Sequence, residues 1–183
     1  HVYNQNLNEK LKDIKIKRKN RNVRLLKVLN DMGYELTVED LIQRPNQRYI
    51  GKPNFAMALK KRGYINNLNE AFMPGKFLES PEVKAVKKDK ISVYEAIKLI
   101  KDAGGISVLA HPMKIHGISK PKCNEYFENL DVLIKRLKLG GLKGIECFHP
   151  SATEEDSLKL VCLAEKYHLH ITEGSDFHGT EFE

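Results

Sequence analysis

The sequence predicts an α/β fold with parallel strands, joined to a small helical module. After residue 90, amphipathic helical segments alternate with short apolar segments, which is the order typical of a parallel sheet or barrel. Between residues 22 and 88 no segment has the pattern of a strand, and Gly, Pro and helix-capping residues divide this stretch into short helices.

The helical module is expected to begin with a long helix over residues 9–32. The second half of this helix carries apolar residues at helical spacing, namely Val23, Leu26 and Leu29. Gly33 is a typical helix stop. Thr37 and Asp40 have the spacing of a helix cap with a carboxylate three residues on, and Pro53 suits the first turn of a further helix.

The α/β part is expected to contain three helix–strand pairs. Ser92 and Glu95 form a capping box that starts the first helix. The predicted strands are short and apolar and cover residues 106–110, 144–148 and 169–172. The helices between them are expected at residues 126–139 and 153–167. Because the chemistry of such folds lies where the strands end, the residues that follow each strand are candidates for a functional site.

Composition and charge limit the classes of function. Hydrophobic residues make up 41% of the chain and charged residues 30%, as in a soluble globular protein, and no apolar stretch approaches the roughly 20 residues of a membrane span. Three cysteines without a Cys-x-x-Cys pair favour reduced thiols and a cytoplasmic location. Residues 10–27 hold nine Lys or Arg and one Asp, a patch that suits phosphate or RNA, although a solvated helix face explains it equally well.

The residues that follow the three predicted strands are rich in metal-ligand types. They are His111, His149, Asp176 and His178. Imidazole and carboxylate groups bind manganese, iron or zinc in hydrolytic sites, where the bound ion activates water. The alternative is a set of separate loop residues with local hydrogen bonds. Ligand types at three consecutive strand ends favour the metal site.

Three motifs in this part of the chain resemble motifs of the PHP (polymerase and histidinol phosphatase) superfamily of metal-dependent phosphoesterases. They are residues 103–112 (AGGISVLAHP), 141–151 (GLKGIECFHPS) and 174–179 (GSDFHG). The nearest branch acts on nucleoside 3′,5′-bisphosphates and short oligoribonucleotides, and it carries a helical insertion before its Ala-His-Pro strand. Residues 50–56 resemble a segment of that insertion.

The resemblance implies that the chain is the C-terminal portion of a distorted seven-stranded βα barrel with a small all-helical insertion domain. The barrel portion would comprise residues 1–21 and 89–183, and the insertion would comprise residues 22–88. The opening motifs of the family would precede residue 1. The fragment alone is therefore expected to have little or no activity.

The resemblance also implies site residues. The implied metal ligands are His111, Asp176, His178 and His1, for a cluster of two or three divalent ions, with Mn²⁺ expected first and Zn²⁺ or Fe²⁺ as alternatives. The implied ligands of substrate phosphate are Arg18, Arg21 and Lys52. Lys52 and Asn54 stand where the branch has Arg and His, so Lys52 retains a charge but no bidentate contact. His149 is an outer-shell partner, a proton donor or a packing residue.

We therefore expect a metal-dependent phosphoester hydrolase whose substrate is a nucleotide or short RNA. One alternative is a module that binds RNA or phosphate without catalysis of its own. Another is a histidinol-phosphate type phosphatase of the same superfamily, which differs only in substrate.

Overall fold

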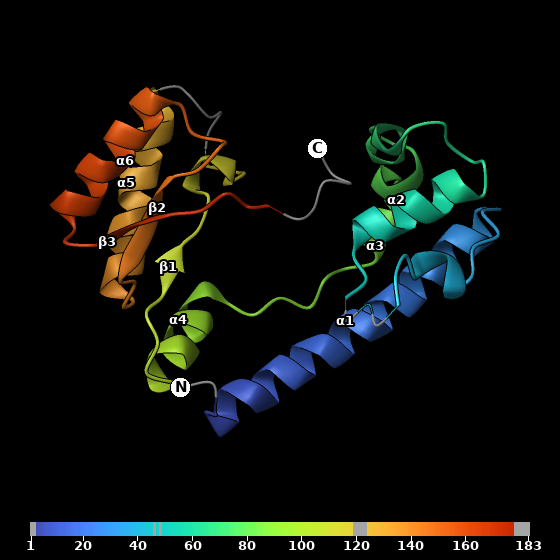
Figure 1. Cartoon of the computed structure of the whole chain (residues 1–183), viewed down its shortest axis with the longest axis horizontal. Coiled ribbons are helices and arrows are strands. Elements are labelled where there is room, and N and C mark those ends of the chain that lie inside the picture. Colours follow the sequence, from blue (N-terminus) through green and yellow to red (C-terminus); the bar gives the residue numbers. More distant parts are fainter. Residues whose placement is uncertain (1–2, 46, 48, 119–123, 178–183) are drawn as a thin grey trace. The chain divides into compact units, whose positions relative to one another are not determined.

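The computed structural model describes residues 3–45, 47, 49–118 and 124–177 and contains two compact units. The first unit comprises residues 1–8 and 91–183, and the second comprises residues 9–90. The strands belong to the first unit, whereas the second is helical (Figure 1). Each unit has its own buried apolar core.

A parallel sheet with the strand order β1-β2-β3 forms the centre of the first unit. Its strands are β1 (Val108–Leu109), β2 (Gly144–Phe148) and β3 (His170–Glu173). The accompanying helices are α4 (Val93–Asp102), α5 (Asn124–Leu139), α6 (Glu154–Lys166) and the 3-10 turn η4 (Pro112–Lys114). The predicted alternation of helix and strand is confirmed, and helical crossovers are what parallel pairing requires.

The two faces of β2 have different roles. Ile145 and Cys147 are fully buried in a core that α4, α5 and α6 share, whereas Glu146 between them points to the other face. Burial raises the pKa of the Cys147 thiol to about 11, so this thiol is protonated and unreactive at neutral pH. β2 thus joins an apolar core on one face to a carboxylate on the other.

The second unit is built around α1 (Gln5–Asp31), whose residues 9–31 belong to it. Its other elements are η1 (Glu39–Leu41), α2 (Lys52–Lys61), η2 (Leu68–Phe72), η3 (Phe77–Glu79) and α3 (Pro81–Ala85). Leu25 and Leu29 of α1 lie in one core with Phe55 and Leu59 of α2. The expected helix stop is confirmed, because Gly33 has the left-handed φ of 92° that terminates α1.

Val23 of α1 is 57% exposed, because the buried face of the helix follows Asn22, Leu25 and Leu29. Residues 9–21 belong to the helical unit, because α1 continues through them without a break, and the expected division into a barrel portion and an insertion stays a prediction.

Within the described residues the sheet has three strands, so the seven-stranded barrel stays a prediction. None of the helices in the described part of the chain is long and apolar enough to cross a membrane.

Candidate metal and phosphate sites

The carboxyl ends of the three strands lie at one edge of the sheet. Parallel pairing sets Leu109 beside Ile145 and Phe148 beside Glu173. Three of the predicted site residues, His111, His149 and Asp176, follow these strand ends within three residues. An open hollow of about 620 Å³ lies at this edge, lined by Phe148, His149 and Glu173 among others. The sheet therefore brings groups that are distant in sequence to a single place.

Glu146 holds the turn that carries His111. The backbone of His111 is left-handed, with φ 33° and ψ 60°, which is unfavourable for a residue with a side chain. The backbone N–H of His111 donates to Oε2 of Glu146 at 2.6 Å. A hydrogen bond to a charged carboxylate is strong enough to offset such strain. Glu146 was not among the predicted site residues, although a carboxylate inside an otherwise apolar strand was a signal of its role.

His149 is buried and presents an N–H group to the other site residues. The backbone N–H of Ser151 donates to Nδ1 of His149 at 2.9 Å, so Nδ1 is an acceptor and the neutral ring carries its proton on Nε2. Nε2 is buried without a hydrogen-bond partner among the described residues and lies 3.8 Å from Oδ2 of Asp176. The centroids of the His149 and His111 rings are 5.8 Å apart. This arrangement leaves Nε2 of His149 available near Asp176.

Asp176 lies beside His149 and a lysine. Its Oδ2 accepts a hydrogen bond from Nζ of Lys114 at 2.8 Å, and its side chain is 30% exposed. Lys114 follows His111 in η4, so two strand-end segments meet through this ion pair. The structure therefore brings His111, His149 and Asp176 together at one edge, as expected.

The other two predicted metal ligands, His1 and His178, lie outside the described residues. Within the described part of the chain, no group of three His, Cys, Asp or Glu side chains has the arrangement of a metal site. Two of the four predicted ligands are thus located, with the imidazole and carboxylate chemistry that suits a hydrolytic metal ion. The metal site itself stays a prediction.

Gly174 allows the Glu146 carboxylate to fit against the neighbouring strand end. A Cβ atom at position 174 would lie 2.3 Å from Oε1 of Glu146. Any side chain there would displace the carboxylate that holds the His111 turn. This close approach explains the glycine that opens the third motif.

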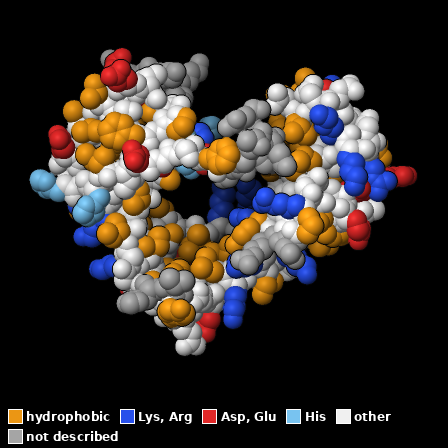
Figure 2. All heavy atoms as spheres, viewed as in Figure 1, with side chains coloured by type: hydrophobic (Ala, Val, Ile, Leu, Met, Phe, Trp, Pro, Cys, Tyr) orange, Lys and Arg blue, Asp and Glu red, His pale blue; other side chains and the backbone are white. Residues whose placement is uncertain are grey.

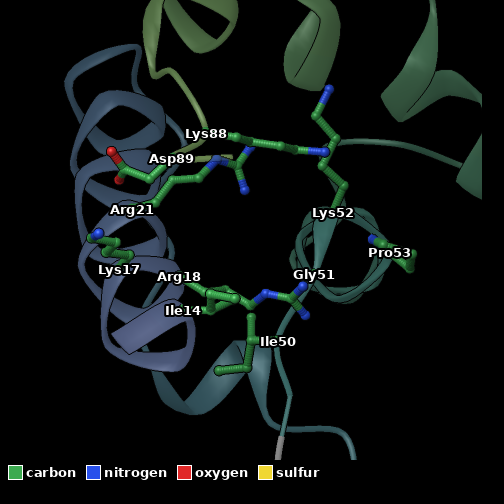
Figure 3. Close-up of a pocket in the computed structure, with 10 residues that line it drawn as sticks. All are labelled: Ile14, Lys17, Arg18, Arg21, Ile50, Gly51, Lys52, Pro53, Lys88 and Asp89. Carbon is green, nitrogen blue, oxygen red and sulfur yellow. The ribbon is translucent and has the colours of Figure 1, made fainter. Parts of the chain in front are cut away.

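A second candidate site is a basic pocket of about 320 Å³ in the helical unit. Arg18 and Arg21 extend into it from α1, Lys52 from the start of α2, and Lys88 from the segment after α3 (Figure 3). Lys and Arg side chains are frequent on the face of this unit shown in Figure 2. The three predicted phosphate ligands are thus brought together. Lys88 was not predicted, and its only sequence signal was a run of lysines between residues 84 and 90.

The electrostatics of this pocket favour an anion. Burial, followed by the charges of Arg18 and Arg24, lowers the pKa of Arg21, which is only 9% exposed and whose Nε has no hydrogen-bond partner among the described residues. Burial, followed by the charges of Arg21 and Lys52, also lowers the pKa of Lys88. Both pKa shifts mean that the pocket disfavours the positively charged forms of Arg21 and Lys88. A phosphate group would remove this penalty and would supply the acceptor that Arg21 lacks.

The ammonium group of Lys52 is already paired. Its Nζ donates to Oε1 of Glu79 at 2.6 Å and to the backbone oxygen of Leu78 at 2.9 Å. Hydrogen bonds from Lys52 and from Lys84 lower the pKa of the Glu79 carboxyl. Lys52 therefore adds positive potential to the pocket but has less freedom to bind a ligand directly than Arg18 or Arg21.

No protein-family model matches the chain. The chain is 34% identical over 91 residues to a phosphoribosyl 1,2-cyclic phosphate 1,2-diphosphodiesterase from Eggerthella lenta, covering 50% of the chain and 30% of that protein. It is 28% identical over 137 residues to a 3′,5′-nucleoside bisphosphate phosphatase from Chromobacterium violaceum, covering 73% and 43%. The chain therefore spans less than half the length of these two relatives.

The fold is similar to that of a solved protein described as a metal-dependent phosphoesterase from Bifidobacterium adolescentis. The TM-score is 0.69 and the sequence identity 27%, over 91% of this chain and 56% of that one. These two relatives and this structural neighbour are named for the cleavage of phosphate esters.

Proposed function

We propose that this chain is part of a metal-dependent phosphoester hydrolase that acts on nucleoside 3′,5′-bisphosphates or short oligoribonucleotides. Its relatives and structural neighbour support a phosphoesterase of the PHP type. The observation on which the proposal depends is the convergence of His111, His149 and Asp176 at the carboxyl edge of the parallel sheet. Active sites of parallel α/β folds lie at this edge.

The metal ligands in this proposal are His111, Asp176, His178 and His1. Their imidazole and carboxylate groups suit Mn²⁺, and also Zn²⁺ or Fe²⁺. A bound divalent ion would supply an activated water and would offset the negative charge that develops on the phosphoryl oxygens.

The protein's own groups position these ligands. Glu146 fixes the backbone of His111 through the bond at 2.6 Å. His149 directs its Nε2–H toward Asp176 and orients that carboxylate, as groups that hydrogen-bond to metal ligands commonly do.

In this proposal the basic pocket favours doubly phosphorylated ends. Arg18 and Arg21 would bind a second phosphate through their guanidinium groups, which match phosphate oxygens in geometry. Lys52 and Lys88 would add positive potential around it. A substrate with one phosphate would leave these cations without an anion.

A second candidate function is phosphate or RNA binding without catalysis. The basic pocket favours it, because this pocket is formed entirely within the helical unit and needs no strand-end residue. Binding of RNA that falls steeply with salt and survives His111→Ala and metal chelation would support this alternative.

The test uses the full-length protein that contains this chain, with Mn²⁺. Phosphate release is measured from adenosine 3′,5′-bisphosphate, a short oligoribonucleotide and histidinol phosphate. We expect hydrolysis of the first two substrates, and we expect chelation to abolish it. His111→Ala and Asp176→Asn should each lower kcat/KM by more than about 100-fold, the upper end of the loss seen for partners of metal ligands.

The matched control is His168→Asn. His168 is exposed, precedes β3 rather than following it, and has a positive φ that Asn tolerates. This variant should keep full activity. Full activity in the two ligand variants, or no hydrolysis of any phosphoester, would contradict the proposal.

A further inference from the structure

A second pocket of about 360 Å³ lies beside the basic pocket, within the helical unit. Arg18 and Ile50 line both pockets, so the two are neighbours, and both residues are drawn in Figure 3. The walls of the second pocket are mainly apolar and include Val23, Leu26, Val38, Leu41 and Ile50. A basic pocket and an apolar pocket thus meet along one helix.

The apolar pocket exposes side chains that would otherwise be buried. Val23 is 57% exposed, Val38 49% and Tyr49 54%. Nζ of Lys15 lies 6.0 Å from the centroid of the Tyr49 ring, and Cζ of Arg18 lies 5.8 Å from it. Contiguous exposed apolar groups with a charged rim mark binding sites. An aromatic ring beside a guanidinium is a surface on which a planar base can stack.

The two amide side chains of this pocket bond to the backbone. Gln47 accepts from the backbone N–H of Gln43 at 3.0 Å and donates to the oxygen of Leu41 at 3.1 Å. Asn22 donates to the oxygen of Ile50 at 2.9 Å, and its Oδ1 is buried. The pocket therefore offers ring faces and apolar contact, but few groups that could read the edge of a base.

We propose that the apolar pocket binds the base of a nucleotide whose phosphate lies in the basic pocket. This inference rests on the proposed function, because it assigns a nucleotide as the substrate. Arg18 links the two parts of the site, since it contacts the phosphate on one side and the Tyr49 ring on the other. Because recognition is by stacking, the site accepts purines and pyrimidines alike.

Calorimetric titration of the chain tests the assignment. The probes are adenosine 3′,5′-bisphosphate and the same sugar bisphosphate without its base. We expect the base to raise the affinity about tenfold or more, the effect of one stacked base. The cytidine, guanosine and uridine bisphosphates should bind within about fivefold of the adenosine compound.

Three variants sharpen the test. Tyr49→Ala should remove the affinity that the base adds and leave binding of the base-free compound unchanged, whereas Tyr49→Phe should retain it. Phe72→Ala is the matched control, because Phe72 is a partly exposed aromatic residue of the same unit that lines neither pocket.

Equal affinity of the wild-type chain for the two bisphosphates would overturn the inference, as would unchanged base-dependent binding in Tyr49→Ala. Hydrolysis by the full-length protein without base dependence would contradict the pocket assignment alone. Base-dependent binding without hydrolysis would contradict the proposed catalysis and support the pocket assignment.

Discussion

The strand-end site and the basic pocket differ in how the chain holds their functional groups. At the strand ends, short segments attached to paired strands carry the groups, and hydrogen bonds from Glu146 and Ser151 fix the turn of His111 and the ring of His149. In the basic pocket, long side chains line the site from α1, α2 and residue 88, and of the five cations Lys17 and Lys52 have close ion pairs, with Asp13 and Glu79. Activity at the strand-end site should therefore be sensitive to small displacements of its side chains. Ligand affinity in the basic pocket should depend on the number of positive charges.

After the two ligand variants His111→Ala and Asp176→Asn, the largest effect is expected for His149. His149→Phe removes the Nε2–H that faces Asp176, and we expect kcat/KM of the full-length protein to fall about 10- to 100-fold, with weaker Mn²⁺ binding. His149→Gln places an amide N–H near the same position and should recover part of the loss. Equal activity of the Phe and Gln variants would show that His149 only packs.

A smaller loss is expected when the Glu146 carboxylate is displaced. Gly174→Ala places a methyl group against Oε1 of Glu146 and should weaken the bond to the backbone of His111. We expect Mn²⁺ affinity to fall by about tenfold, as for other groups that support metal ligands. Gly117→Ala is the control, because a Cβ there meets no atom within 4 Å, although Gly117, unlike Gly174, has a left-handed φ of 89°.

The affinity of the basic pocket for a bisphosphate should fall by a small factor for each cation that is removed. Arg21→Ala removes one nearly buried guanidinium, and we expect roughly fivefold weaker binding of adenosine 3′,5′-bisphosphate, the effect of one lost hydrogen bond. The slope of affinity against salt concentration should become shallower as well. Lys12→Ala, on α1 but outside the pocket, should change neither quantity.

The smallest functional effect is expected at Asp40, which lies away from both sites. A hydrogen bond from Arg62 lowers the pKa of this buried carboxyl from 3.8 to about 2. The ionised form therefore stabilises the helical unit above about pH 4, and this stability is lost as the pH falls toward 2.

Asp40→Asn should lower the free energy of unfolding by roughly 1 to 2 kcal/mol at pH 7 and flatten its pH dependence in that window. Denaturation at pH 7, 4 and 2.5 measures this. Bisphosphate binding at pH 7 should be unchanged, and an equal loss of stability at all three pH values would contradict the assignment.

Local signals predicted much of the fold. β2 occupies residues 144–148 as expected, and Thr153 and Asp156 cap each other at the start of α6. β1 is shorter than predicted: its two strand residues pair with β2, whereas Ile106 is 60% exposed. The length of a strand depends on which residues pair with the neighbouring strand. The sequence of one segment alone does not contain this information.

The sequence predicted the site residues whose position depends on the local backbone. It did not predict those that meet only because distant segments pack together. His111 and Asp176 follow strand ends, which the apolar pattern locates. Lys88 and the pairing of Lys52 with Glu79 depend on how separate helical segments pack, and no local pattern encodes this. The apolar character of Val23 does not show that this side chain lines an exposed pocket.

The ion pair between Lys114 and Asp176 has a consequence for how the α/β unit forms. A carboxylate with an ammonium group 2.8 Å away does not oppose folding as a bare negative charge would. The edge of the sheet can therefore assemble before any cation arrives from solution. Under the proposed function, metal binding then replaces the Lys114 ammonium group beside Asp176 by a metal cation. Folding of this unit therefore does not require the metal.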